Sequence, residues 1–306
     1  MLIEPSDILR SKAKIAGASE WLRDLPSLVD TLSAEWGFNV DHGFADGTEA
    51  FVAAVTMGDG SQAVLKLLIP RTDALENGEI TVLQLANGDG CAALLRADPE
   101  RRALLLERLG PSLHDLDLPI GQRHEILCVT ALAFWRQAVN TGLLNGAEKG
   151  QRLIDSITKL WPAIRRPCSE LAVRHAVECA RRRIAAHDDH RAVLVHGDVH
   201  EWNVLQAGDS FKLIDPDGLI VEPEYDLGII MREDADELLA AESVVDASWQ
   251  RARWLATRCG LDPVATWEWG VVERVSTGLL ASQLGLQPFG RDMLAVSDAL
   301  AEASIK

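Results

Sequence analysis

Three features are missing from the sequence: a long apolar run, paired cysteines and an excess of basic charge. No stretch of about 18 apolar residues occurs, so no membrane-spanning helix is predicted. The opening MLIEPSDILRSK also lacks the continuous apolar segment of a signal peptide. The chain carries 30 basic against 46 acidic residues, a formal net charge of −16, which opposes broad contact with a phosphate backbone. We therefore expect neither a membrane nor a nucleic acid as partner.

The five cysteines include no C-x-x-C pair and are odd in number, which argues against both a zinc site and a disulfide framework. Reduced thiols in a cytoplasmic protein fit this pattern best. With 306 residues, of which 47% are apolar, the chain can form one large or two modest domains with a real core. We expect a monomer or a weak dimer.

The first third of the chain predicts a small antiparallel sheet with one inserted helix. Apolar residues recur at helical spacing and are followed by strand-like runs between turn residues, including the hairpin signal Gly58-Asp59-Gly60. The predicted elements are a helix from Ser19 that Pro26 interrupts and Gly37 ends, strands over 51–57 and 63–69, a helix over 72–86, and strands over 92–95 and 103–106.

After Gly110-Pro111 the pattern becomes mainly helical. Long helices are predicted over 121–140, 150–161 and 169–187, a strand-like stretch over 192–215, and further helices from about 234 to the end. A β-rich region followed by a helical region is typical of an α+β fold with two lobes. We expect an N-lobe of residues 1–108 and a C-lobe of residues 109–306.

The stretch LVHGDVHEWNV follows a short apolar strand in the second lobe, so its polar residues stand at a strand end. The next segment, NVLQAGDSFKLIDPDG, predicts a hairpin that turns at Ala207-Gly208-Asp209-Ser210. If Gln206 pairs with Phe211, Asn203 pairs with Ile214, and Asp215 emerges beside Asn203. Asp198, Asn203 and Asp215 are therefore expected to converge.

Oxygen ligands without thiolates favour Mg²⁺, which is usually shared with the phosphates of a substrate. One carboxylate then remains to orient a hydroxyl group and accept its proton, as phosphoryl transfer requires. The other lobe has to supply a cation for the phosphates, and Lys66, a lone charge in the apolar AVLKLL, is the candidate. A buried lysine needs an acidic partner. Glu76 and Glu79 both lie on the following helix, and the sequence does not choose between them.

HGDVHEWN, LIDPDG and EPEYDL together resemble the motifs of aminoglycoside phosphotransferases, specifically those of the streptomycin 6-kinase and hydroxyurea phosphotransferase family. SEWLRDLP, DGSQAVLK and NGDG occur in the order that this resemblance implies, so it extends over nearly the whole chain. The resemblance implies a protein-kinase-like fold that binds ATP and Mg²⁺, with a small N-lobe sheet and a larger helical C-lobe.

The resemblance also implies roles in the second lobe. Asp198 resembles the catalytic base, Asn203 and Asp215 the metal ligands, and Asp226 the residue that braces the catalytic loop. For His196 a structural role is favoured over chemistry, and His200 is left open between loop packing and a substrate contact.

In the first lobe, Lys66 resembles the residue that binds the α- and β-phosphates of ATP. Glu107, Arg108 and Leu109 correspond to the hinge whose backbone meets adenine. One departure concerns the segment FADGTEAFV, which lacks the G-x-G-x-x-G phosphate loop of protein kinases. The sequence does not decide between ATP and GTP.

The predicted function is transfer of a phosphoryl group to a hydroxyl of a small, cationic molecule of the streptomycin type. Hydroxyurea or another metabolite is an alternative acceptor. The acidic run from Glu233 to Glu237 is interpreted first as a solvated helix start and second as part of a pocket for a cationic acceptor. A metallophosphatase is disfavoured because no G-N-H-[DE] motif follows GDVH. A nucleotide-binding pseudokinase is the alternative without catalysis.

Overall fold

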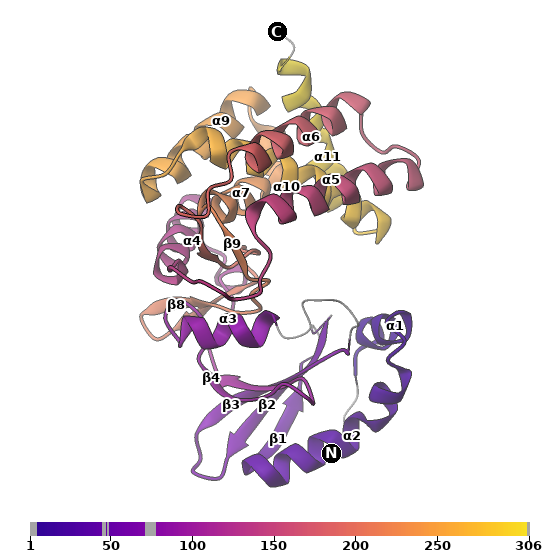
Figure 1. Ribbon diagram of the computed structural model, residues 1–306, viewed down its shortest axis with the longest axis vertical. Coiled ribbons are helices and arrows are strands. Elements are labelled where there is room, and N and C mark those ends of the chain that lie inside the picture. Colours follow the sequence, from indigo (N-terminus) through magenta and orange to yellow (C-terminus); the bar gives the residue numbers. More distant parts are fainter. Residues whose placement is uncertain (1–4, 45–46, 48, 71–77, 305–306) are drawn as a thin grey trace. The chain divides into compact units, whose positions relative to one another are not determined.

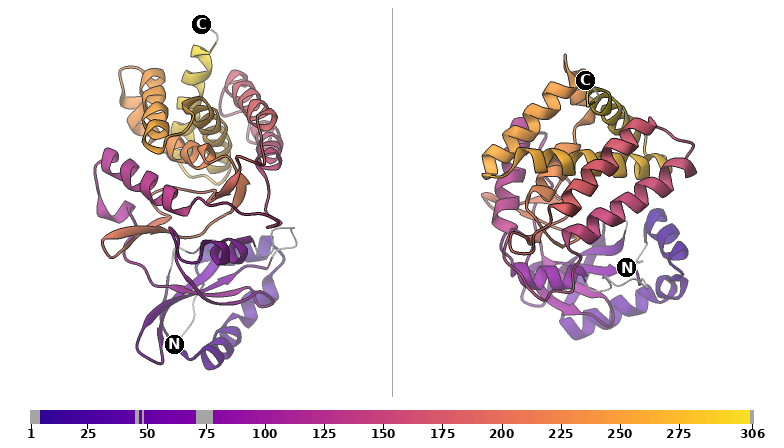
Figure 2. Two further views of the ribbon diagram at one scale, coloured as in Figure 1. Left: turned by 60° about the vertical axis from the view of Figure 1, so that its left-hand side comes forward. Right: turned by 45° about the horizontal axis from the view of Figure 1, so that its top comes forward.

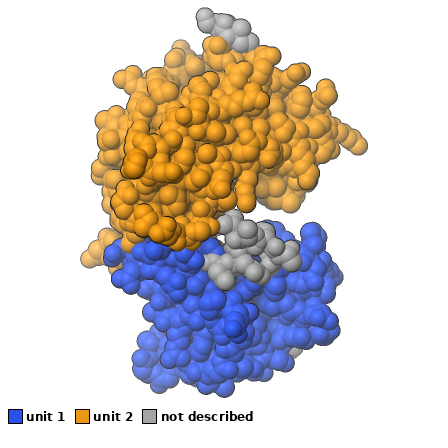
Figure 3. Space-filling model, in the orientation of Figure 1, with its two compact units in different colours: residues 1–110 blue, residues 111–306 orange. Residues whose placement is uncertain are grey.

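Residues 5–44, 47, 49–70 and 78–304 are described by the structure, which is a computed structural model. The chain divides into unit 1, residues 1–110, and unit 2, residues 111–306, which are coloured separately in Figure 3. Each unit has a hydrophobic core of its own.

Unit 1 is built on a five-stranded antiparallel sheet in the order β1-β2-β3-β5-β4 (Figure 1). The strands β2 (Ala50–Met57) and β3 (Gln62–Leu68) form the first predicted hairpin. The second predicted pair is confirmed as β4 (Leu94–Asp98) and β5 (Ala103–Glu107). The edge strand β1 (Phe38–Gly43) was not predicted, because four of its six residues are exposed and the apolar alternation is limited to Phe38 and Val40.

Helices cover both faces of this sheet. The helices α1 (Asp7–Ile15) and α2 (Ser19–Trp36) contribute to one apolar cluster with Leu65 and Leu67 of β3. Because successive side chains of a strand point to opposite faces, Lys66 points away from that cluster. It meets α3 (Gly78–Ala86) on the other face of the sheet.

Two helix predictions are wrong in extent. Pro26 does not interrupt α2, because Leu25 and Val29 beside it are buried in the core of unit 1 and hold the helix through the proline. The helix predicted over 121–140 is α4 (Ile120–Phe134), which ends earlier because the backbone of Trp135 is extended. Of the helix predicted over 72–86, residues 72–77 lie outside the described part of the chain.

Unit 2 is mainly helical, with two short strand pairs. β6 pairs with β9, and β7 with β8. Its elements are the 3-10 helix His114–Leu116, α4, α5 (Gly146–Ala163), α6 (Glu170–Ala185), β6 (Val193–Val195), β7 (Val204–Ala207), β8 (Ser210–Leu213), β9 (Leu219–Val221), α7 (Glu224–Arg232), α8 (Ala235–Ala240), α9 (Val244–Cys259), α10 (Pro263–Gln283) and α11 (Phe289–Ala303).

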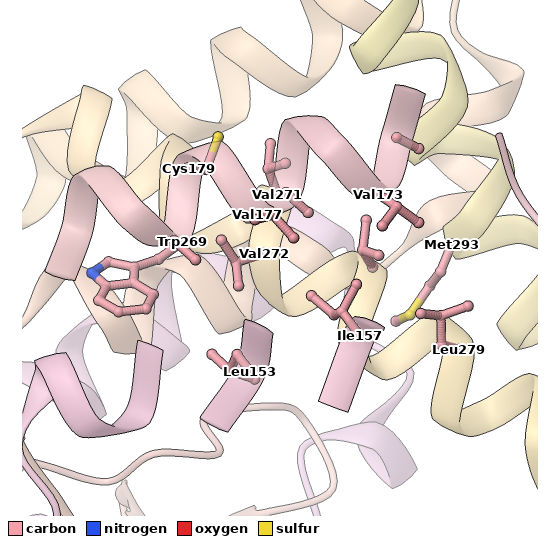
Figure 4. Packing of buried hydrophobic residues seen from close by; sticks show 14 of the residues in the cluster. Leu153, Ile157, Val173, Val177, Cys179, Trp269, Val271, Val272, Leu279 and Met293 are labelled. Carbon is pink, nitrogen blue, oxygen red and sulfur yellow. The ribbon is translucent and has the colours of Figure 1, made fainter. Parts of the chain in front are cut away.

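The core of unit 2 surrounds α10, which packs on α5, α6, α7, α9 and α11 (Figures 1 and 2). Figure 4 shows Trp269, Val272 and Leu279 of this helix among apolar side chains of its neighbours. A helix that is buried nearly all round is expected at the centre of a helical unit. Among the helices that the structure describes, none combines the length and apolar composition that crossing a membrane requires.

Candidate active site

The hairpin predicted after the HGDVHEWN motif is present in the predicted register. In the ladder of β7 and β8, Gln206 lies opposite Phe211 and Val204 opposite Leu213. Beyond the ladder, the Ile214 N–H donates to the carbonyl oxygen of Asn203 at 2.9 Å. Local turn chemistry and strand pairing thus bring Asn203 next to the residue that precedes Asp215.

Asp215 and Asn203 lie at the open end of this hairpin. The backbone of Asp215 is left-handed, with φ 58°, so the chain turns sharply there. Asn203 reaches the loop that carries Asp198 through its side-chain amide. Its Nδ2 donates to the carbonyl oxygen of Asp198 at 3.0 Å and to the carboxylate Oδ2 at 3.2 Å.

Three side chains hold the carboxylate of Asp198. Arg232 Nη2 donates to Oδ1 at 2.9 Å, and His200 Nε2 lies 3.1 Å from Oδ2, which Asn203 also contacts. Burial raises the pKa of Asp198, but the hydrogen bond and charge of His200 and the charge of Arg232 lower it more. The net pKa lies well below the ordinary value, so the carboxylate is ionised. Its side chain is 35% exposed, which leaves it open to a substrate.

His196 connects the loop that carries Asp198 to the end of the hairpin. Its side chain is fully buried, with Nε2 2.9 Å from the carbonyl oxygen of Ile214, while Nδ1 accepts from the Asp198 N–H at 3.3 Å. These contacts require the tautomer with hydrogen on Nε2. Burial lowers the pKa of His196 and keeps the ring neutral. The ring links the loop to the end of the hairpin, in agreement with the structural role predicted for it.

His200, whose role the sequence leaves open, belongs to the surroundings of Asp198. Burial lowers the pKa of His200, but the hydrogen bond and charge of Asp198 raise it above its ordinary value. The contact with Asp198 therefore favours protonation of this imidazole relative to a free histidine. When protonated, the ring adds a positive charge, beside that of Arg232, to the environment of the carboxylate.

Asp226, in the first turn of α7, binds the backbone of the loop. Its Oδ2 accepts from the His196 N–H at 3.0 Å and from Trp135 Nε1–H at 2.8 Å, and its Oδ1 accepts from the Gly197 N–H at 2.8 Å. The residue is fully buried, and burial raises the pKa of its carboxyl group. The three donors fix both oxygens, so Asp226 braces the backbone of the loop that carries Asp198.

The donor set at the hairpin end fits a hard divalent cation. Both hydrogen bonds of the Asn203 side chain use Nδ2, so its Oδ1 is left as an oxygen donor. Asp215 contributes a carboxylate. An amide oxygen and a carboxylate, without thiolates, match the preferences of Mg²⁺.

Lys66 of unit 1 pairs with Glu79 of α3. Nζ lies 2.6 Å from Oε1, and the two side chains are only 6% and 13% exposed. Glu76, the alternative partner, lies outside the described residues. The acidic partner predicted for this buried lysine is therefore present, and contact of Lys66 with phosphates stays a prediction.

The predicted hinge begins at the end of β5. The Glu107 N–H donates to the carbonyl oxygen of Ala93 at 2.9 Å, and its carboxylate accepts from the Ala93 N–H at 3.0 Å. The guanidinium of Arg108 lies 4.6 Å from the ring centroid of Phe44. Leu109 follows and is half-buried. The contact of this segment with adenine stays a prediction.

The acidic run after α7 is in part the solvated helix start that was predicted, because Asp236 and Glu237 are exposed in the first turn of α8. Glu233 accepts from Arg232 Nε at 2.8 Å, and Asp234 accepts from Arg123 Nη2 at 2.8 Å. Glu237 pairs with Arg251. Ion pairs thus hold the less exposed Glu233 and Asp234, whereas the helix start itself stays open to solvent.

Sequence reasoning missed Arg232, which contacts Asp198 directly, and Glu273, which holds Arg232 in turn. The sequence did contain a pattern that could have indicated Arg232. It is a cation at the end of the apolar stretch LGIIM, just as Lys66 is a cation within an apolar strand. Glu273 lies in a long helix pattern and carries no comparable signal.

Comparisons with known proteins identify the family of the chain. A family model described as aminoglycoside/hydroxyurea antibiotic resistance kinase matches residues 35–283. Streptomycin 6-kinase of Streptomyces glaucescens is 28% identical over 277 residues, 87% of each chain. Hydroxyurea phosphotransferase of Kitasatospora aureofaciens is 30% identical over 241 residues, 73% of this chain and 66% of that protein.

Among solved structures, the amicoumacin kinase hAmiN, in complex with AMP-PNP, Ca²⁺ and Ami, aligns with a TM-score of 0.60 at 14% identity. The alignment covers 92% of this chain and 94% of that chain. This likeness confirms the predicted kinase-like α+β fold.

Proposed function

Because the chain belongs to the aminoglycoside/hydroxyurea antibiotic resistance kinase family, we propose that it transfers the γ-phosphoryl group of ATP to a hydroxyl group of a small cationic acceptor. The acceptor class is that of streptomycin. The family is one of kinases, and the finer assignment of donor and acceptor rests on the site and on the names of the relatives.

The arrangement around Asp198 is the observation that carries the proposal. Its carboxylate is ionised, partly exposed and fixed by Arg232, His200 and Asn203. Phosphoryl transfer asks for a base that orients the attacking hydroxyl, with little covalent chemistry by the protein. A fixed carboxylate next to the hard oxygen donors of Asn203 and Asp215 supplies that arrangement.

In the proposed step, Asp198 accepts a hydrogen bond from the acceptor hydroxyl and aligns its oxygen with the γ-phosphorus. The new bond joins that oxygen to phosphorus, and the bond from phosphorus to the β,γ-bridging oxygen breaks. ADP leaves with the electron pair, and the proton passes to Asp198 and then to solvent. Because the pKa of Asp198 is low, the proton is expected to move late, after most of the bond to ADP has broken.

We propose the following roles toward the nucleotide. Lys66, held by Glu79, is proposed to bind the α- and β-phosphates, and backbone groups of residues 107–109 to meet adenine. Asn203 and Asp215 would hold Mg²⁺, which neutralises charge on the phosphates when bound.

The proposed acceptor is cationic. Asp217, two residues after Asp215, has an exposed side chain. A guanidinium or ammonium group of an acceptor pairs well with such a carboxylate. The net charge of −16 also favours the approach of a cation.

An assay that couples ADP formation to a spectroscopic signal tests the proposal, with ATP, Mg²⁺ and a panel of streptomycin, other aminoglycosides, hydroxyurea and amino sugars. Turnover that depends on streptomycin, with a product heavier by one phosphate in mass spectrometry, is expected. Turnover only with hydroxyurea would mean that the acceptor is hydroxyurea, as in the name of the Kitasatospora relative.

Two aspartate variants test whether turnover in the assay depends on Asp198. Asp198→Asn should lose at least about a thousandfold in kcat, since it removes the base. Asp209→Asn, in the exposed turn of the same hairpin, should retain full activity. ATP binding without turnover on any acceptor would indicate a pseudokinase and overturn the proposal.

A further inference from the structure

Arg232, the last residue of α7, uses its guanidinium to join three carboxylates. Nε donates to Glu233 Oε1 at 2.8 Å, Nη1 to Glu273 Oε2 at 3.1 Å, and Nη2 to Asp198 Oδ1 at 2.9 Å. The side chain is only 9% exposed. Each of the three nitrogens of the planar guanidinium thus meets a different partner, so its orientation is determined.

The surroundings of Arg232 fix it before any substrate binds. Tyr225 donates its hydroxyl hydrogen to Glu273 Oε1, so the carboxylate that anchors Nη1 is itself anchored. Arg274, fully buried in α10, donates to the carbonyl oxygens of Met231 and Arg232. The C-terminal end of α7 is therefore tied to α10 through both side chain and backbone.

The other end of α7 holds the same loop. Asp226, in its first turn, accepts the backbone N–H groups of His196 and Gly197. A single helix of nine residues thus binds the backbone of the catalytic loop at one end and the carboxylate of Asp198 at the other.

We infer that Arg232 is a positioning residue, which sets the orientation of the Asp198 carboxylate toward the acceptor hydroxyl; this inference rests on the proposed function. Arg232 fixes Oδ1, and His200 and Asn203 fix Oδ2. Without the contact at Oδ1, the carboxylate is free to rotate away from the attacking geometry. Small errors in that geometry reduce phosphoryl transfer strongly.

The variant Arg232→Lys tests whether the directions of the three hydrogen bonds matter in addition to the positive charge. Arg232→Lys keeps one positive charge, but a single ammonium cannot reach three carboxylates in the directions of a guanidinium. We expect kcat to fall about 10- to 100-fold, since the energy of one charged hydrogen bond corresponds to a change of that order. The Kd of a non-hydrolysable ATP analogue, measured by calorimetry, should change less than about twofold, which a general loss of structure would not permit.

Arg183→Lys is the matched control, because Arg183 is also a poorly exposed arginine that pairs with two glutamates, Glu222 and Glu268. It should lose similar stability in thermal unfolding while kcat stays within about twofold of wild type. If Arg232→Lys keeps the wild-type kcat, or if both variants lose kcat equally, the positioning role is wrong while the proposed function stands.

A crystal structure of Arg232→Lys beside one of the wild type gives a measurement that needs no turnover. The carboxylate of Asp198 is expected to rotate and to lose at least one of its contacts with His200 and Asn203. An unchanged carboxylate would overturn the inference. Absence of turnover in the wild type would contradict the proposed function alone.

Discussion

Lys66 Nζ lies 2.6 Å from Glu79 Oε1 and joins β3 to α3 within unit 1. The strand alternation explains the contact. Leu65 and Leu67 are buried on the face covered by α1 and α2, so Lys66 has to point to the face that carries α3. Of the two glutamates that the sequence offered, Glu79 makes a contact that the structure describes, and Glu76 lies outside the described residues.

Glu79→Gln should lower kcat/KM for ATP by about 10- to 100-fold, because it removes a negative charge that holds the ammonium of Lys66. The loss should appear mainly in the apparent affinity for the nucleotide. Steady-state kinetics with varied ATP, together with calorimetric binding of a non-hydrolysable analogue, measure it.

Glu49→Gln is the control for that measurement. Glu49 pairs with Lys12 in the same unit, but both side chains are well exposed, at 46% and 34%. A pair of that kind contributes little, so ATP kinetics should match the wild type. Equal losses in Glu49→Gln and Glu79→Gln would contradict a specific role for the Lys66 pair.

Gly228→Ala tests how closely α7 packs on α10. A Cβ at Gly228 would lie 2.5 Å from Trp269 Cβ and 2.8 Å from the Gly270 nitrogen, so the two helices have to separate. We expect a loss of about 1–3 kcal/mol in the free energy of unfolding. Because α7 holds the catalytic loop at both ends, kcat should fall as well. Thermal unfolding and the ADP assay measure the two effects.

Gly121→Ala provides the comparison. Gly121 also lies in a helix, α4, but apart from its chain neighbours and the backbone of its own helix, no atom of the described residues lies within 4 Å of a Cβ built there. Alanine should leave stability unchanged or raise it by up to about 1 kcal/mol, because it is the better helix former. A similar loss in both variants would mean that helix propensity, and not packing, decides the effect at Gly228.

The sequence predicted the parts of the fold that depend on local signals. The hairpin of β7 and β8 follows from its turn residues and the alternation of two short strands, and its register was correct. By contrast, α7 was not predicted. All nine of its residues are buried, so no polar face reveals a helical period. β9 has only three residues and pairs with β6, which precedes it by more than twenty residues in the chain.

The same distinction applies to the site. Asn203 and Asp215 could be brought together by counting residues around one turn, and Asp198 lies close to Asn203 in sequence. Arg232 and Glu273 reach Asp198 only through the packing of α7 on α10. That packing depends on long-range contacts, such as Gly228 against Trp269, which no local pattern encodes.

Asp226→Asn should weaken the hydrogen bonds that hold the loop of Asp198, while the size of the side chain is unchanged. Three N–H groups, from His196, Gly197 and Trp135, point at the two carboxylate oxygens, and an amide would turn its NH₂ toward at least one of them. Leaving a buried donor without an acceptor costs about 1–3 kcal/mol. We expect a lower melting temperature and a loss of at least about 100-fold in kcat. The control Asp209→Asn should show neither effect.

Asp234 gives unit 2 a predictable dependence on pH. Burial raises its pKa, but the neighbouring His124, with Nε2 3.4 Å from Oδ2, and the charges of Arg123 and Arg251 lower it more, so its pKa is below the ordinary value. A group whose pKa is lower in the folded state stabilises the fold above its unfolded pKa, and the stabilisation is lost as pH falls through the folded value.

Asp234→Asn should therefore reduce the free energy of unfolding at pH 7 by about 1–2 kcal/mol, the energy of a hydrogen bond to a charged group. The difference from the wild type should shrink as pH falls below about 4, where the unfolded carboxyl group becomes protonated. Urea unfolding followed by circular dichroism, at pH 7, 5, 4 and 3, measures that difference. Asp155→Asn, an exposed change on α5, should give a small difference at every pH. A constant gap between Asp234→Asn and the wild type across this range would mean that the carboxylate is not stabilised by its cationic neighbours.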